Sequence, residues 1–320
     1  MRHRKNPFTS LRKSLARASN KFLIFLLKLS ISAASLYLIF RKTDAEHVAH
    51  ILKSIGLLFF LGIASLYIAS QLISSLRWRT LLPHRFPVMK LFSLYMIGSF
   101  FSTFLPGLIG GDAIRAYYLN KDAKQISITL ASVFMDRYIG FVTLMMIGVA
   151  AFPFSLGSFA GSSYTWLMPV IFVSFVAASI FFFGLQLGKR FRVMTEFYDY
   201  FSLLKERKGT IASALAFSVV IQVMNFFMVI ILVWRMGLQV SLLQLAVFLP
   251  IVITVSSLPI SISGLGVREG AFVILLGLIG IGPEAATSLS LSWFFSTVLG
   301  SLPGLLFYFF HDRDRKKDSP

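Results

Sequence analysis

Two short segments hold the residues whose types and spacing suit them to bind a charged ligand. The first spans residues 106–115 and contains Pro106, Gly110, Gly111, Asp112 and Arg115. Proline cannot continue a helical hydrogen-bond ladder and glycine permits close backbone approach, so one helix should end here and another begin. We expect Asp112 to cap the second helix, whose free N–H groups and Arg115 would bind a phosphate. The alternatives are a plain capping role for Asp112 and an interfacial arginine whose charged end reaches water.

The second segment spans residues 259–270 and has the same features. It contains Pro259, Gly264, Gly266, Arg268 and Glu269. Charged side chains at membrane depth are costly and usually functional, so Arg268 and Glu269 need partners there. Free backbone groups at that depth must be buried in protein or line a wet cavity. Both segments therefore predict cavities.

A third charged position, Asp136 and Arg137, lies inside an apolar run. Adjacent residues point about 100° apart on a helix, so the two side chains should meet different partners. We hypothesise that Arg137 pairs with Asp112 and Asp136 with Arg115. The alternative is a structural ion pair that only fixes packing.

The surrounding sequence is that of a membrane protein. Of 320 residues 56% are hydrophobic and 14% are charged, against about 25% charged in a soluble domain. Stretches of about 20 apolar residues suffice to cross a bilayer. We predict an all-α polytopic membrane protein with about six full transmembrane helices and two broken re-entrant hairpins, about eight to ten helical segments in all. The predicted full spans are 22–40, 56–76, 126–151, 164–187, 210–234 and 286–310, and the hairpins are 90–119 and 241–280. The stretches 41–53, 153–163 and 189–208 are expected to be loops.

The placement of the basic residues behind the net charge of +18 indicates how the chain is oriented in the membrane rather than nucleic-acid binding. Basic residues flank the apolar segments, which is typical of cytoplasmic loops and of contacts with anionic lipid. Residues 1–21 then form a basic cytoplasmic segment and residues 311–320 a basic cytoplasmic tail. This arrangement requires both broken segments to return to the side from which they enter. We expect an integral protein of a bacterial inner membrane.

The two broken segments also suggest an internal repeat. Pro106, Gly111 and Arg115 recur as Pro259, Gly264 and Arg268, displaced by 153 residues. Given the topology above, residues 56–151 and 210–310 would be inverted halves of the domain at 22–310, as in many secondary transporters. The alternative is a chance match, since proline and glycine are common in transmembrane helices.

Several chemistries find no support in the sequence. There is no cysteine, which excludes disulfides, thiol catalysis and cysteine-ligated metals. No Ser-His-Asp set or phosphate-binding P-loop is recognisable. We expect no enzyme activity, no cofactor and no metal.

Three stretches in order resemble one known family. They are FLPGLIGGDAIRAYYL at 104–119, MDRYIG at 135–140 and LPISISGLGVREGAFV at 258–273, with RWRTLLP upstream. They are similar to the transmembrane region of lysylphosphatidylglycerol synthases, the flippase-like half of multiple peptide resistance factors. In the larger members a cytoplasmic half makes the aminoacylated lipid, and this chain ends at Pro320, so we expect no synthase activity. The resemblance implies roles for Pro106, Gly110, Gly111, Asp112, Arg115, Asp136, Arg137, Gly264, Gly266, Arg268 and Glu269.

Together these features predict a flippase or transporter for an anionic or modified phospholipid or glycolipid. Two cavities opening to opposite leaflets, each floored by one hairpin, would hold the headgroup in turn. The alternatives are an accessory subunit of a glycosyltransferase or lipid-modifying pathway, and an ion-coupled transporter of a soluble substrate that uses the carboxylates. The expected partners are membrane lipids, with no nucleic acid, and either a second copy of the chain or a lipid-modifying enzyme.

Overall fold

The chain is described here from a computed structural model. The structure describes residues 29–30, 33–34, 37, 41, 44–104, 109–159, 161–184, 192–258, 260–261 and 263–318. The predicted span 22–40 therefore lies mostly outside the described residues, as do Pro106 and Pro259.

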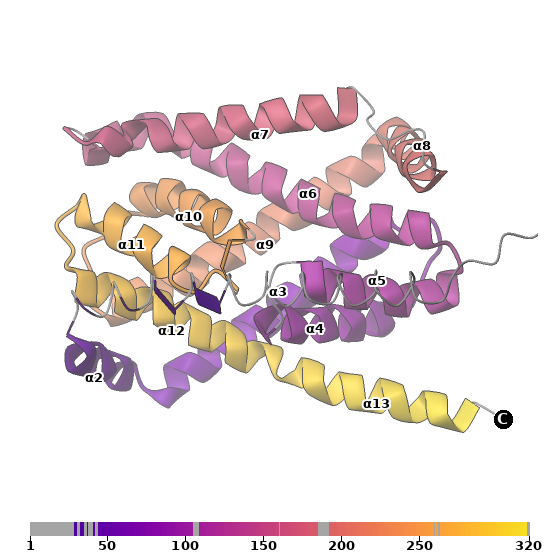
Figure 1. Cartoon of the computed structure of the whole chain (residues 1–320), viewed down its shortest axis with the longest axis horizontal. Coiled ribbons are helices and arrows are strands. Elements are labelled where there is room, and N and C mark those ends of the chain that lie inside the picture. The colour runs from indigo at the N-terminus through magenta and orange to yellow at the C-terminus, as the bar shows by residue number, and fades with distance from the viewer. Residues whose placement is uncertain are drawn as a thin grey trace, which may run out of the picture.

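The described part of the chain is helical throughout and contains no strand (Figure 1). In chain order the helices are α2 (Ala45–Ile55), α3 (Leu57–Leu81), α4 (Val88–Phe104), α5 (Ile109–Ala123), α6 (Ile126–Ala151), η1 (Phe152–Phe159), η2 (Ser163–Trp166), α7 (Leu167–Gly184), α8 (Arg192–Glu206), α9 (Lys208–Arg235), α10 (Leu242–Ser257), α11 (Val267–Gly277), α12 (Pro283–Ser301) and α13 (Pro303–Asp318).

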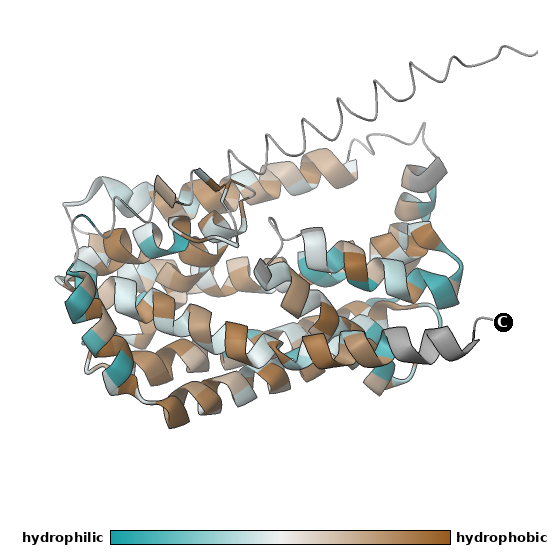
Figure 2. Cartoon of the chain, turned by 60° about the horizontal axis from the view of Figure 1, so that its bottom comes forward, coloured by the Kyte–Doolittle hydropathy of each residue, from teal (hydrophilic) through white to brown (hydrophobic). Residues whose placement is uncertain are grey.

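Five helical segments are long and apolar enough to cross a bilayer. They are Leu57–Leu81, Ile126–Phe159, Ser163–Gly184, Lys208–Arg235 and Pro283–His311. Five of the six predicted full spans therefore coincide with spanning helices, and the all-α polytopic prediction is confirmed for the described residues. Figure 2 shows hydrophobic residues along most helix lengths and many hydrophilic ones near the helix ends. This distribution suits a chain whose helices cross an apolar layer.

The order of the helices agrees with a repeat displaced by 153 residues. Adding 153 to the residue numbers of α3, α4, α5 and α6 gives ranges that overlap those of α9, α10, α11 and α12, in that order. In each set, two shorter helices separated by a break form a hairpin between two longer ones. In Figure 1 the α10–α11 hairpin lies in the left half of the molecule and the α4–α5 hairpin in the right half. The helices α3 and α9, which precede the hairpins, pack against each other.

Two predicted loops are wrong because they are short amphipathic helices. The stretch 41–53 contains most of α2, which begins after Asp44, whose carboxylate accepts from the backbone N–H of Glu46 at 2.9 Å. The stretch 189–208 contains α8, which buries Phe197, Tyr198 and Tyr200. Neither helix contains the long apolar run that marks a span, so a search for apolar length overlooks both. The stretch 153–163 is likewise mostly 3₁₀-helical.

The last predicted span is interrupted between Ser301 and Pro303. Helix α12 ends at Ser301, and α13 begins at Pro303, where proline is tolerated as a first helical residue. At Gly304 the backbone packs so closely on α4 that an added Cβ would overlap the carbonyl oxygen of Met96. Helix α13 continues to Asp318, so the predicted tail is largely helical.

Candidate functional site

The glycines of the first hairpin lie inside a helix rather than at the predicted break. Helix α4 ends at Phe104 and α5 begins at Ile109, so Gly110 and Gly111 belong to the first turn of α5, while residues 105–108 lie outside the described residues. Asp112 is likewise a first-turn residue rather than the cap we expected. The glycine at 111 has a packing role, because a Cβ there would overlap the carbonyl oxygen of Gly98 in α4. The two arms of the hairpin therefore touch backbone to backbone.

The second hairpin turns where the glycines predict it. Ser263, Gly264 and Gly266 have φ values of +50°, +76° and +82°, a region that glycine enters at little steric cost. The carboxylate of Glu269 accepts from the backbone N–H of Gly266 at 2.6 Å and so caps the start of α11. Ser263 Oγ lies 3.0 Å from the carbonyl oxygen of Ser102. The tip of the second hairpin thus contacts the last turn of α4.

A buried carboxylate, Asp136, organises the first half of the site. It is fully buried and accepts from Arg77 Nε at 2.8 Å, from Tyr95 Oη at 2.6 Å and from Arg115 Nη2 at 3.1 Å. These donors come from α3, α4 and α5, whereas Asp136 belongs to α6. A charge removed from water needs such complete pairing to be tolerated. The carboxylate therefore ties four helices together.

A second carboxylate, Asp112, extends this network from the buried Arg115 to the partly exposed Arg137. It lies 3.0 Å from Arg115 Nε and 3.0 Å from Arg137 Nε. The predicted pairings of Arg137 with Asp112 and of Asp136 with Arg115 are both confirmed. The two cations differ in exposure, since 1% of the Arg115 side chain is exposed and 47% of the Arg137 side chain is.

Arg115 is placed too deep for the phosphate-binding role we expected. Its guanidinium also lies 4.8 Å from the ring centroid of Trp78 and 4.4 Å from that of Tyr95. Two carboxylates and two aromatic faces thus surround it. Substituting Arg115 removes a buried structural cation, so its loss should weaken folding.

Arg77, Trp78 and Tyr95 belong to the site but were not among the predicted site residues. The predicted span ends at residue 76, whereas α3 continues to Leu81 and leaves Arg77 only 5% exposed. Its Nη1 also bonds Ser218 Oγ at 2.9 Å, which reaches across to α9. No local signal marked Arg77, because the predicted Arg115 and Arg137 already balance Asp112 and Asp136 in charge.

In the second half, Arg268 and Glu269 pair with each other although they are adjacent. Arg268 Nη2 lies 2.8 Å from Glu269 Oε1, and both side chains bond Ser290 Oγ. Glu269 is fully buried, and the Arg268 guanidinium lies 4.8 Å from the ring centroid of Phe294. Both residues are therefore partnered within the second half, at α11 and α12.

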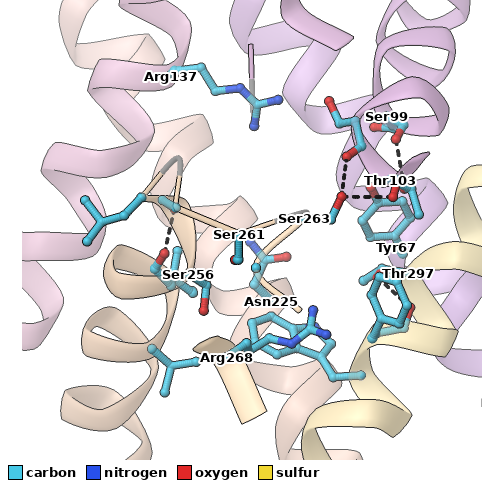
Figure 3. Close-up of a pocket in the computed structure, with 18 of the residues that line it drawn as sticks. Tyr67, Ser99, Thr103, Arg137, Asn225, Ser256, Ser261, Ser263, Arg268 and Thr297 are labelled. Carbon is cyan, nitrogen blue, oxygen red and sulfur yellow. Dashed lines mark hydrogen bonds between the residues drawn. The ribbon is translucent and has the colours of Figure 1, made fainter. Parts of the chain in front are cut away.

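The two hairpins line one pocket, which we call the polar pocket, with a volume of about 320 Å³ (Figure 3). Its polar lining from the first half is Tyr67, Gln71, Ser99, Ser102, Thr103 and Arg137. Its polar lining from the second half is Asn225, Ser256, Ser257, Ser261, Ser263, Arg268, Trp293 and Thr297. Figure 3 shows Arg137 and Arg268 on opposite sides of this space. Both hairpins thus contribute to one pocket, whereas we expected each hairpin to floor a cavity of its own.

A larger apolar cleft of about 630 Å³ adjoins the polar pocket. Arg137, Gln71, Asn225 and Ser257 line both spaces. The outer wall of the cleft is apolar and largely aromatic, with Leu130, Phe134, Tyr138, Phe141 and Phe175. Leu130 and Phe134 are 42% and 39% exposed, so this wall continues to the surface of the spans. Arg137 therefore stands where a polar space meets an apolar one.

The predicted site residues thus separate into three groups. Arg137, Gly264 and Arg268 line the polar pocket, and Asp112 lines the apolar cleft. Arg115, Asp136 and Glu269 are buried in ion pairs behind these surfaces. Gly110 and Gly111 lie in α5, and Gly266 precedes α11.

Comparison with known proteins places the chain at the level of a family. No curated protein and no solved structure matches it. A family model described as the lysylphosphatidylglycerol synthase TM region matches residues 25–304, which include both hairpins and the whole charged network. The chain therefore belongs to the lysylphosphatidylglycerol synthase transmembrane-region family.

Proposed function

We propose that this protein transfers a lipid with an anionic or modified headgroup between the leaflets of a membrane, and that it does so without synthase activity. The headgroup would enter the polar pocket while the acyl chains remain in the apolar cleft and the surrounding bilayer. The observation that carries the proposal is the position of Arg137, a half-exposed cation at the boundary between these two spaces. A lipid has the same division into a polar head and apolar chains.

The arrangement of the hairpins supplies a path for the headgroup. Each hairpin enters from one end of the molecule, and the tips touch beside the polar pocket through Ser263 and Ser102 (Figures 1 and 3). Parting of the tips would let a headgroup bound from one leaflet leave toward the other. Broken helices that meet near the bilayer midplane serve this purpose in many transporters.

The ion-coupled transport of a soluble substrate is less well supported. That alternative requires a carboxylate free to bind a proton or cation. Asp136 and Glu269 are fully buried and bonded to arginines, and Asp112 is shared between Arg115 and Arg137. Each is already neutralised by a fixed cation. The wide apolar cleft also has no role in that scheme.

Transfer of a labelled lipid in vesicles tests the proposal. The purified protein is reconstituted with phosphatidylglycerol that has a fluorescent acyl chain, and dithionite quenching reports the fraction exposed outside. We expect transfer by the native protein and at least a tenfold loss with Arg137→Gln. This variant should still fold, because Arg115 continues to pair with Asp112.

The matched control is Arg235→Gln. Arg235 is an exposed arginine at the end of α9, and it bonds the carbonyl oxygen of Ser54 away from both spaces. It should retain full transfer. Equal transfer by Arg137→Gln and the native protein would show that the polar pocket takes no part in transfer. No transfer by the native protein would refute the proposed function.

A further inference from the structure

We infer that the polar pocket selects a lipid headgroup that has a single phosphodiester and uncharged hydroxyl groups, as in a polyol or sugar phosphate, and rejects one that bears an ammonium. This inference rests on the proposed lipid transfer and names its substrate class. It follows from the charges around the pocket, from its unpartnered polar atoms and from its size.

The charges near the pocket sum to a small positive value. Arg77, Arg115 and Arg137 form one network with Asp112 and Asp136, which leaves one positive charge. The second network, Arg268 with Glu269, is neutral. One excess positive charge matches a phosphodiester, which carries one negative charge. A phosphomonoester or diphosphate would bring more negative charge than this site balances.

No carboxylate from the described residues lines the polar pocket. Asp112 opens on the apolar cleft, and Glu269 is fully buried behind Arg268. An ammonium in the pocket would face two guanidinium groups whose carboxylate partners lie outside the pocket lining. Like charges brought together in a space of low dielectric repel strongly. An aminoacylated headgroup is therefore the wrong match for this pocket.

Four polar atoms of the pocket find no hydrogen-bond partner among the described residues. They are Ser102 Oγ, Ser256 Oγ, Ser261 Oγ and Trp293 Nε1, and all four are buried. Ser261 is only 2% exposed as a whole. Buried polar groups in native proteins are nearly always bonded, so unpartnered ones at a pocket indicate a polar occupant. They come from α4, from the second hairpin and from α12, on several sides of the space.

Hydroxyl groups suit this set of atoms better than ammonium groups do. A serine hydroxyl both donates and accepts, while the indole of Trp293 only donates. Sugar and polyol hydroxyls can accept from Trp293 and exchange hydrogen bonds with the three serines. An ammonium group itself has no acceptor to offer, so it cannot take the place of a hydroxyl that accepts from Trp293. The volume of about 320 Å³ is at the low end of ligand pockets and suits one small headgroup.

Binding in detergent tests the selection independently of transfer. The probes are short-chain phosphatidylglycerol, phosphatidylinositol, lysyl-phosphatidylglycerol and phosphatidic acid. Their binding is measured by the change in tryptophan fluorescence, and Trp293→Phe shows how much of that change comes from Trp293. We expect phosphatidylglycerol and phosphatidylinositol to bind at least tenfold more tightly than the other two. Equal or tighter binding of lysyl-phosphatidylglycerol would overturn the inference.

The serine hydroxyls are tested by a paired substitution. Ser256→Ala with Ser261→Ala should weaken phosphatidylinositol binding about tenfold and leave phosphatidic acid binding unchanged, without loss of thermal stability. The control is Ser292→Ala with Ser296→Ala, because these hydroxyls bond main-chain carbonyls within α12 and do not line the pocket. Equal phosphatidylinositol binding by both double variants would show that the unpartnered serines do not contact the head.

Vesicle transfer then separates this inference from the proposed function. Selective binding without transfer of any lipid would leave the headgroup class standing and refute transport. Transfer at equal rates for all four headgroups would leave transport standing and refute selection. Selective binding together with faster transfer of the two hydroxylated phosphodiesters is the result we expect.

Discussion

Ser263 and Thr103 join the two hairpins at their tips, with Ser263 Oγ 2.9 Å from the carbonyl oxygen of Thr103. The residues lie 160 positions apart, and each belongs to a different half of the chain. Ser263 also has a φ of +50°, which a serine adopts only when its surroundings hold it there. The contact therefore closes the space between the hairpins beside the polar pocket.

Tying these tips together should stop lipid transfer. The chain has no cysteine, so Thr103→Cys with Ser263→Cys introduces the only two thiols. A short, reducible bis-thiosulfonate cross-linker should reduce transfer in vesicles at least tenfold, because the headgroup must pass the contact, and dithiothreitol should restore it. Each single-cysteine variant treated with the same reagent is the control. Undiminished transfer by fully cross-linked protein would mean that the tips need not part.

Asp136 should matter to folding more than to lipid binding. Asp136→Asn leaves Arg77 and Arg115 buried beside a neutral amide, and breaking a buried pair in this way costs about 3–5 kcal/mol. Thermal unfolding in detergent should therefore occur at a clearly lower temperature. The control is Asp122→Asn at the half-exposed pair with Lys90, which should cost at most about 1 kcal/mol. Similar unfolding temperatures for the two variants would contradict the structural role of Asp136.

The close approach of α4 and α5 gives a third prediction. In Gly111→Ala the added Cβ meets the main chain of Gly98, which cannot swing away as a side chain can. We expect this variant to unfold at a lower temperature. Gly270→Ala is the matched control, since nothing lies within 4 Å of its added Cβ, and alanine in a helix is favoured over glycine by about 0.5–1 kcal/mol. If Gly111→Ala is as stable as Gly270→Ala, the hairpin arms are not packed as described.

Much of this arrangement could be predicted from local sequence features. Long apolar runs marked the spans, because a segment that crosses lipid must be helical. Proline with glycine marked both hairpins, because these residues act locally on backbone geometry. The pairing of Asp112 with Arg137 was predictable because membrane-embedded charges need opposite partners. These predictions needed no knowledge of how the helices cross.

The remaining features depend on packing between distant helices. Arg77 joins Asp136 only because α3 crosses α6, and nothing near Arg77 in the sequence records that crossing. The meeting of the two hairpins in one pocket depends likewise on Ser263 reaching Thr103. Helix α8 was missed for a different reason, since its apolar residues form one face rather than a continuous run.

Membrane orientation gives the last prediction. By the positive-inside rule the loop between α3 and α4, which contains His84 and Arg85, should be cytoplasmic. The loop between α9 and α10 contains Gln239 and should face outward, because α9 is a single crossing that follows the basic stretch at 189–208. Both His84 and Gln239 are exposed. A membrane-impermeant maleimide should label Gln239→Cys in intact cells and His84→Cys only after permeabilisation. The cysteine-free native chain is the background control, and labelling of both positions in intact cells would contradict re-entrant hairpins combined with cytoplasmic termini.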